Sequence, residues 1–165
     1  MTTTTYLDGE TSTPPECVGP LSIAPRLALT LRALSEEAAV DDLVPLWVCA
    51  TELVRRFSAP ERPIRVHVIC GPLEAVTPPA EPWNSVRSFR EALAEPAGCR
   101  MSTAPVELAV LVSQDRERLY VERTTDAPDV PTAQCWAQRF LRLLTALADE
   151  ADAPLTAHAL PDDDA

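Results

Sequence analysis

The sequence predicts an α/β fold in which helices cover a small mixed sheet. Segments 21–57 and 129–150 repeat apolar residues three and four positions apart, as amphipathic helices do. Segment 62–71 alternates apolar and polar residues, which is typical of a strand with one buried face. Apolar segments 106–112 and 119–123, joined by a polar stretch, predict a hairpin. The expected order of elements is α-α-β-(α)-β-β-α.

The first predicted helix occupies residues 21–40. Ser22 is its expected cap, and Pro25 fits the first turn, where a missing amide hydrogen costs nothing. The apolar positions at helical spacing are Leu27, Leu31, Leu34 and Ala38. This pattern predicts one face buried against the rest of the protein.

The second predicted helix, 41–57, has a broader apolar face. Its members are Leu43, Leu46, Trp47, Ala50, Leu53, Val54 and Phe57. Asp41 or Asp42 can cap the free amides at its start. Arg55 and Arg56 lie in its last turn, where positive charge complements the helix dipole.

The strand predicted in segment 62–71 has two different faces. Ile64, Val66, Val68 and Cys70 point one way, and Arg65, His67 and Ile69 point the other. Four prolines predict a loop over residues 71–83, and a short helix follows in 84–95.

The last predicted helix, within 129–150, has the clearest apolar face. Asp129 is its expected cap, and Pro131 fits the first turn. The apolar face consists of Trp136, Phe140, Leu143, Leu144 and Leu147.

Length and composition indicate a single globular domain of 165 residues. We expect a flexible N-terminal arm over residues 1–20, an α/β domain over 21–160 and an acidic tail over 161–165. The N-terminal residues do not resemble a secretory signal, and no apolar run is long enough to span a membrane. We therefore expect a cytoplasmic protein.

The charge balance limits the partners. A formal net charge of −11 argues against nucleic acid and anionic membranes, which attract clustered cations. The five cysteines form no CxxC pair, so neither a zinc site nor a disulfide framework is indicated. No glycine-rich phosphate loop is present, and we expect no metal or cofactor.

His67 and Cys70 are the residues best suited to catalysis. A histidine can act as a base, and a cysteine at a strand end can act as a nucleophile. Three residues apart on one strand, however, their side chains point to opposite faces and do not pair. We therefore interpret His67 as a half-exposed sheet residue and Cys70 as a core thiol, and assign no catalytic residue.

Several segments, in order, resemble the C-terminal lobe of condensation domains of nonribosomal peptide synthetases. "LRAL" at 31–34 and "LVRRF" at 53–57 precede the central strand and Gly71, as in that family, and "SVRSFREAL" at 85–93 fits a helix that follows it. The final third matches a hairpin, a "D-x-x-T" helix start and an "F-x-x-L-L-x-A-L" helix. Its matching residues are Asp129, Thr132, Phe140, Leu143, Leu144, Ala146, Leu147, Pro154 and Leu155.

This resemblance covers residues 21–160 and implies one lobe of a chloramphenicol-acetyltransferase-like fold. The family's catalytic HHxxxDG motif, which belongs to its other lobe, is absent from the sequence. The family's long segment before the hairpin is reduced to the residues between Glu95 and Val106. The chain thus resembles a pruned C-terminal lobe.

The resemblance implies a noncatalytic accessory protein of natural-product biosynthesis. Its partner would be a synthetase module, a carrier protein or a tailoring enzyme. The residues expected to contact the partner are Arg55, Arg56, Arg62, Arg87 and Arg90. Carrier proteins are commonly acidic, as this chain is, which weighs against them.

Two alternatives stay open. The first is an acyltransferase-type enzyme whose site forms only between subunits of a homo-oligomer, where an interface supplies a partner for His67 or Cys70. The second is a structural or regulatory α/β protein that shares only the fold.

Overall fold

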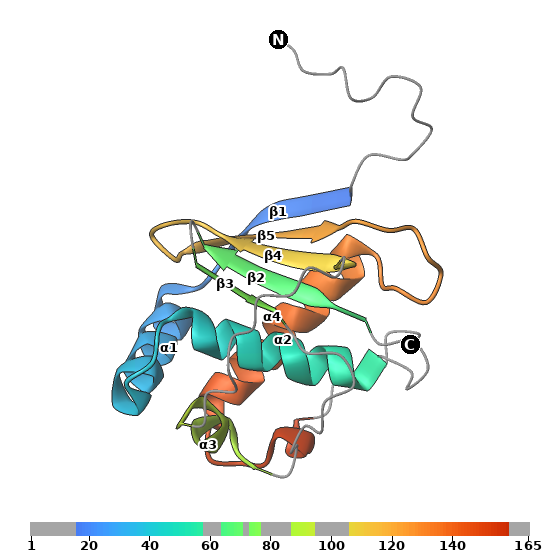
Figure 1. The fold of residues 1–165 in the computed structure, drawn as a ribbon. Helices are drawn as coiled ribbons and strands as arrows, with labels where there is room; N and C mark the ends of the chain where they lie inside the picture. The colour runs from blue at the N-terminus through green and yellow to red at the C-terminus, as the bar shows by residue number, and fades with distance from the viewer. Residues whose placement is uncertain (1–15, 58–63, 71–72, 77–86, 95–105, 159–165) are drawn as a thin grey trace.

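The fold is built on one five-stranded mixed sheet (Figure 1). The computed structural model describes residues 16–57, 64–70, 73–76, 87–94 and 106–158. In chain order its elements are β1 (Glu16–Ser22), α1 (Pro25–Ala38), α2 (Leu43–Phe57), β2 (Val66–Cys70), β3 (Leu73–Val76), α3 (Phe89–Ala94), β4 (Leu108–Val112), β5 (Arg118–Arg123), α4 (Ala133–Asp149) and a 3-10 turn (Leu155–Ala157). The strand order is β1-β5-β4-β2-β3. Strands β2 and β4 pair in parallel, and the other pairs are antiparallel.

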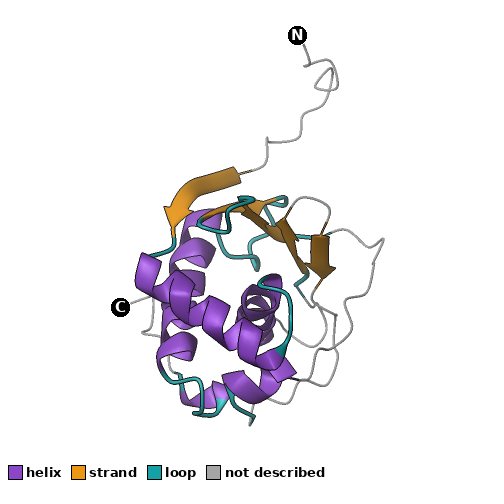
Figure 2. Cartoon of the chain, turned by 90° about the vertical axis from the view of Figure 1, so that its left-hand side faces the viewer, coloured by secondary structure: helices purple, strands orange, loops and turns teal. Residues whose placement is uncertain are grey.

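The helices lie together on one side of the sheet (Figures 1 and 2). Alternation along each strand turns every second side chain toward them. The inward side chains of the central strands are Val66, Val68, Cys70, Leu108, Val110, Val112, Leu119 and Val121, and all are buried. The predicted α/β fold, with helices over a small mixed sheet, is confirmed.

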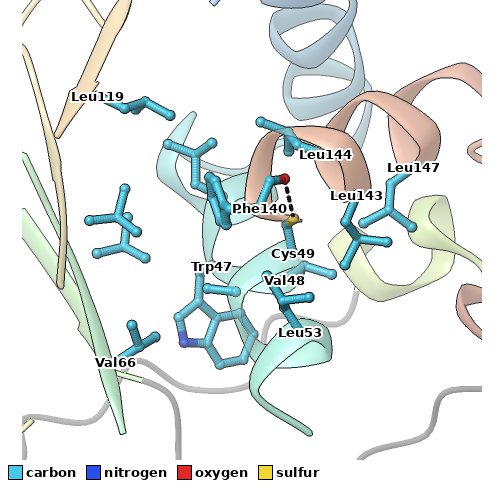
Figure 3. Packing of buried hydrophobic residues seen from close by; sticks show 14 of the residues in the cluster. Trp47, Val48, Cys49, Leu53, Val66, Leu119, Phe140, Leu143, Leu144 and Leu147 are labelled. Carbon is cyan, nitrogen blue, oxygen red and sulfur yellow. Dashed lines mark hydrogen bonds between the residues drawn. The ribbon is translucent and has the colours of Figure 1, made fainter. Parts of the chain in front are cut away.

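The hydrophobic core fills the space between the sheet, α2 and α4 (Figure 3). Val48, Cys49 and Leu53 of α2 have no exposed surface. The thiol of Cys49 donates a hydrogen bond to the carbonyl oxygen of Phe140 across 3.6 Å, which ties α2 to α4. Trp136 of α4 lies against the rings of Phe140 and Phe57, with centroid distances of 6.3 and 6.5 Å.

Two strands lie where the sequence predicted other structure. The expected arm, 1–20, overlaps β1, whose residues from Glu16 onward pair with β5; residues 1–15 lie outside the described part of the chain. The sequence of β1 does not look like a strand, because most of its side chains are exposed and it contains the Gly19–Pro20 step. Proline is tolerated in a sheet only at edges and bulges, and β1 is an edge strand. Residues Leu73–Val76, expected in the loop 71–83, pair with β2 as edge strand β3.

Three expected helix caps have different outcomes. Ser22 does not cap α1, which begins after Ala24 with no side-chain cap; Pro25 occupies the first turn, as predicted. The Asp41 carboxylate accepts a hydrogen bond from the Leu43 amide at 2.8 Å and so caps α2. The expected cap Asp129 lies outside α4, whose first amides are capped by Thr132 instead.

We expect the Thr132→Ala substitution to lower the free energy of unfolding by about 1 kcal/mol. The Thr132 hydroxyl accepts a hydrogen bond from the Cys135 amide at 3.2 Å, and alanine leaves that donor without its partner. Urea unfolding followed by circular dichroism measures the change. Asp126→Ala, at an exposed position before the helix, is the control and is expected to stay within about 0.5 kcal/mol of the parent. A Thr132→Ala effect no larger than that of the control would contradict the capping role.

Candidate functional site: two surfaces on opposite sides of the helices

His67 lies on the side of the sheet that faces away from the helices. It is half-buried in β2, and its register partner in β4 is Ala109. Its Nε2 atom is screened from solvent and has no hydrogen-bond partner among the described residues. The prediction of a half-exposed sheet histidine is confirmed.

Cys70 lies on the other face of the same strand. Its side chain is buried, and its thiol donates to the carbonyl oxygen of Ser113 at 3.5 Å. His67 and Cys70 are therefore separated by the sheet and form no nucleophile–base pair in this chain, as their spacing predicts.

Cys49 is a second buried cysteine, in α2. Cys17, Cys49, Cys70 and Cys135 form no disulfide among the described residues. Burial raises the pKa of the Cys49 thiol well above its ordinary value, which keeps it protonated and unreactive at neutral pH.

Arg55 and Arg56, two of the expected partner contacts, bind a buried carboxylate. Glu52 has a side chain with no exposed surface, and it accepts from Arg55 Nη2 at 2.8 Å and from Arg56 Nε at 2.9 Å. The hydrogen bond to Glu52 raises the pKa of Arg55. Arg56 also donates to the carbonyl oxygens of His158 at 2.7 Å and Leu155 at 3.0 Å. Arg56 therefore anchors the segment that follows α4.

Arg90 bridges two acidic side chains from other elements. Its guanidinium binds Glu37 of α1 and, at 2.8 Å, Asp152 after α4. These hydrogen bonds, first that to Asp152 and then that to Glu37, raise the pKa of Arg90. Arg87 is half-buried, and its carbonyl oxygen accepts from the Leu155 amide at 2.9 Å. Arg62, the fifth expected contact, lies outside the described residues.

Arg90 lies in a groove between α1, α3 and the end of α4. The groove has a volume of about 550 Å³ and is lined by Thr30, Ala33, Leu34, Glu37, Arg90 and residues 148–153. Glu37, Asp149, Glu150 and Asp152 contribute four carboxylates against the one guanidinium of Arg90. The carbonyl end of α4 adds partial negative charge at the same place. We call this the acidic groove; it favours positively charged groups.

The outer sheet face is the second surface. It consists of the outward side chains Cys17, His67, Ile69, Ala109, Leu111, Arg118, Tyr120 and Glu122. Strand register places Ile69 beside Leu111 and Leu111 beside Tyr120, so three partly exposed side chains form an apolar row. A second row runs from His67 through Ala109 and Glu122 to Cys17.

Neither surface was identified from the sequence. Only the packing of α1, α3 and the end of α4 brings the carboxylates of the acidic groove to Arg90, and no local pattern predicts that packing. Strand alternation signalled the outward position of His67, but the neighbouring strands in the sheet depend on pairing order. The ion pairs of Glu52 had a local signal, since Arg55 and Arg56 follow it at helical spacing.

Neither a metal site nor a membrane-spanning helix is found in the described part of the chain. Within residues 16–57, 64–70, 73–76, 87–94 and 106–158, no group of three or more His, Cys, Asp and Glu side chains is placed to hold a metal ion. Among the helices in those same ranges, none has the length and apolar character needed to cross a membrane.

The fold is that of about half a condensation domain, in the chloramphenicol-acetyltransferase-like class. The solved structure of the first condensation domain of the CDA synthetase is similar with a TM-score of 0.60 and 16% identity, over 95% of this chain and 50% of that one. The condensation domain of the Monacolin K polyketide synthase MokA is similar with a TM-score of 0.58 and 10% identity, over 86% of this chain and 49% of that one.

The predicted relationship is thereby confirmed at the level of the fold. This chain spans about half the length of the solved condensation domains that it matches. No family model and no curated protein matches its sequence.

Proposed function

We propose that this protein is a noncatalytic accessory protein of nonribosomal peptide biosynthesis, which binds a component of the synthetase. The observation that carries the proposal is the fold, which corresponds to about half a condensation domain. A protein with half of that fold could still bind other components of a synthetase, although it lacks the second lobe of a complete condensation domain. The relation between fold and function is an analogy and needs a direct test.

The arrangement of the chemical groups supports a binding role. The sequence contains no HHxxxDG motif. The two candidate catalytic side chains, His67 and Cys70, lie on opposite faces of β2. Binding, in contrast, needs only a shaped and charged surface, and the acidic groove is one.

The acidic groove is the proposed contact surface. Its carboxylates favour a partner that presents arginine or lysine, and unlike charges across an interface speed association. An acidic carrier protein would be repelled there, so a synthetase module or a tailoring enzyme suits the groove better. Arg90 stays a proposed contact residue, although a partner would have to compete with Glu37 and Asp152 for it.

A pull-down from extract of the native cells tests this function. The tagged protein is expected to capture a synthetase subunit or a tailoring enzyme, identified by mass spectrometry. Asp149→Lys, which reverses one charge in the groove, is expected to reduce that capture at least about tenfold.

The matched control is Glu36→Lys. Glu36 is exposed on α1 but does not line the groove, so its reversal makes the same change in net charge elsewhere. Equal loss with both variants would point to overall charge rather than the groove. If the parent protein captures no synthetase component or tailoring enzyme, the accessory function is wrong.

A further inference from the structure

We propose that the outer sheet face pairs with the same face of a second copy of this chain, about a twofold axis that passes over Tyr120. This inference does not depend on the accessory function. The elements that line the acidic groove, α1, α3 and the end of α4, lie on the helix side of the sheet (Figure 1), so pairing of the outer sheet faces leaves the groove open.

The outer sheet face has the character of a covered surface. All helices of the described residues lie on the opposite side of the sheet (Figures 1 and 2). The apolar row of Ile69, Leu111 and Tyr120 runs across three adjacent strands and stays partly exposed. Contiguous apolar surface of this kind marks interaction sites on soluble proteins.

The charges on β5 are self-complementary. Arg118 and Glu122 each lie two residues from Tyr120, in opposite directions along the strand, and share its outward face. We place the twofold axis midway between two facing sheets, parallel to both and perpendicular to β5 at Tyr120. This axis makes the two β5 strands antiparallel. Arg118 of each copy then faces Glu122 of the other. A twofold interface requires such a match of a surface with itself.

The distances involved suit sheet packing. Facing sheets lie about 10 Å apart, which arginine and glutamate side chains span together. The Arg118 side chain is 56% exposed, and its ion pair with Asp115 is long, at 3.8 Å. The guanidinium is therefore available to a closer carboxylate. Along the twofold axis, the apolar row of Ile69, Leu111 and Tyr120 in one copy contacts the same row in the other.

A second copy fits this face better than an unrelated charged partner. The protein as a whole carries a formal net charge of −11, which repels a copy of itself over most of its surface. On the outward side of β5, Arg118 balances Glu122, so the repulsion between two copies is reduced there. Pairing at the β1 edge is disfavoured, because Pro20 and a register irregularity between Val18 and Leu21 interrupt its hydrogen-bonding pattern.

A charge-swap series tests the pairing. Sedimentation equilibrium over micromolar concentrations is expected to show a dimer for the parent chain. Arg118→Glu and Glu122→Arg each place like charges opposite one another at two symmetric positions, and each is expected to weaken dimerisation at least about tenfold. The double variant, with both changes, is expected to restore the parent dissociation constant to within about threefold.

Arg142→Glu, at an exposed position of α4 on the helix side, is the control and is expected to leave the dimer intact. Circular dichroism shows whether each variant is folded. A parent chain that stays monomeric overturns the proposal. So does a dimer that single reversals leave unchanged, because it must then use another surface, and so does a double variant that does not recover.

Discussion

Replacing Arg56 by methionine is expected to lower the free energy of unfolding by about 3–5 kcal/mol. Glu52 has no exposed side-chain surface, so a carboxylate that loses Arg56 stays buried with its charge less well compensated. The same change removes the donors to the carbonyl oxygens of His158 and Leu155. A buried charge and unpaired acceptors are each costly, which makes the expected effect large.

Arg55→Met is the matched comparison. Arg55 binds the same carboxylate, but its side chain is 41% exposed against 18% for Arg56. Solvent reaches its guanidinium, and its loss leaves the hydrogen bonds of Arg56 to Leu155 and His158 in place, so we expect a smaller cost of about 1–2 kcal/mol. Chemical denaturation of both variants, followed by circular dichroism, gives the two free energies. Equal losses would contradict the distinction between a buried anchor and a half-exposed partner.

The role of Arg56 changes how the basic residues are interpreted. The sequence placed Arg55 and Arg56 in the last turn of a helix, which holds, and suggested that they meet a partner. In the structure Arg56 also holds residues 155–158 against α2, from which they are separated by about 100 positions in the sequence. The helical spacing of Glu52 with both arginines was visible in the sequence. That the carboxylate is buried follows only from the packing of α2 beneath the sheet.

The elements that the sequence predicted best are those with long, regular patterns. Helices α2 and α4 repeat apolar residues over several turns, and β2 alternates over its whole length, so period alone identifies them. Edge strands give a weaker signal. In β1 most side chains are exposed, and β3 is four residues long in a proline-rich segment, so neither pattern reaches the length at which alternation is convincing.

Both candidate surfaces depend on pairing that local patterns do not specify. Alternation places His67 and Ile69 outward, but Leu111 and Tyr120 become their neighbours only because β4 lies between β2 and β5. The acidic groove likewise joins α1, α3 and the end of α4. The resemblance to condensation domains indicated the order of elements, and thus the fold, without indicating which side chains would lie on its surfaces.

Replacing Trp136 by alanine is expected to lower the free energy of unfolding by about 3–5 kcal/mol. Its ring is fully buried and contacts the rings of Phe57 of α2 and Phe140 of its own helix. Alanine removes this aromatic contact and leaves a cavity where α2 meets α4. The guanidinium carbon of Arg139, 4.3 Å from the centre of the Phe57 ring, covers the same cluster from outside and would not fill the gap.

Trp136→Phe separates packing from hydrogen bonding. The Nε1 atom of Trp136 is buried and has no hydrogen-bond partner among the described residues, so phenylalanine removes a donor that gains nothing. We expect this variant to cost less than half as much as alanine, as measured by guanidinium chloride unfolding followed by circular dichroism. Equal costs would mean that the indole nitrogen binds a group essential to the core. A small cost for both variants would mean that other contacts hold α4 in place. The helices that support the outer sheet face and the acidic groove would then not depend on this aromatic cluster.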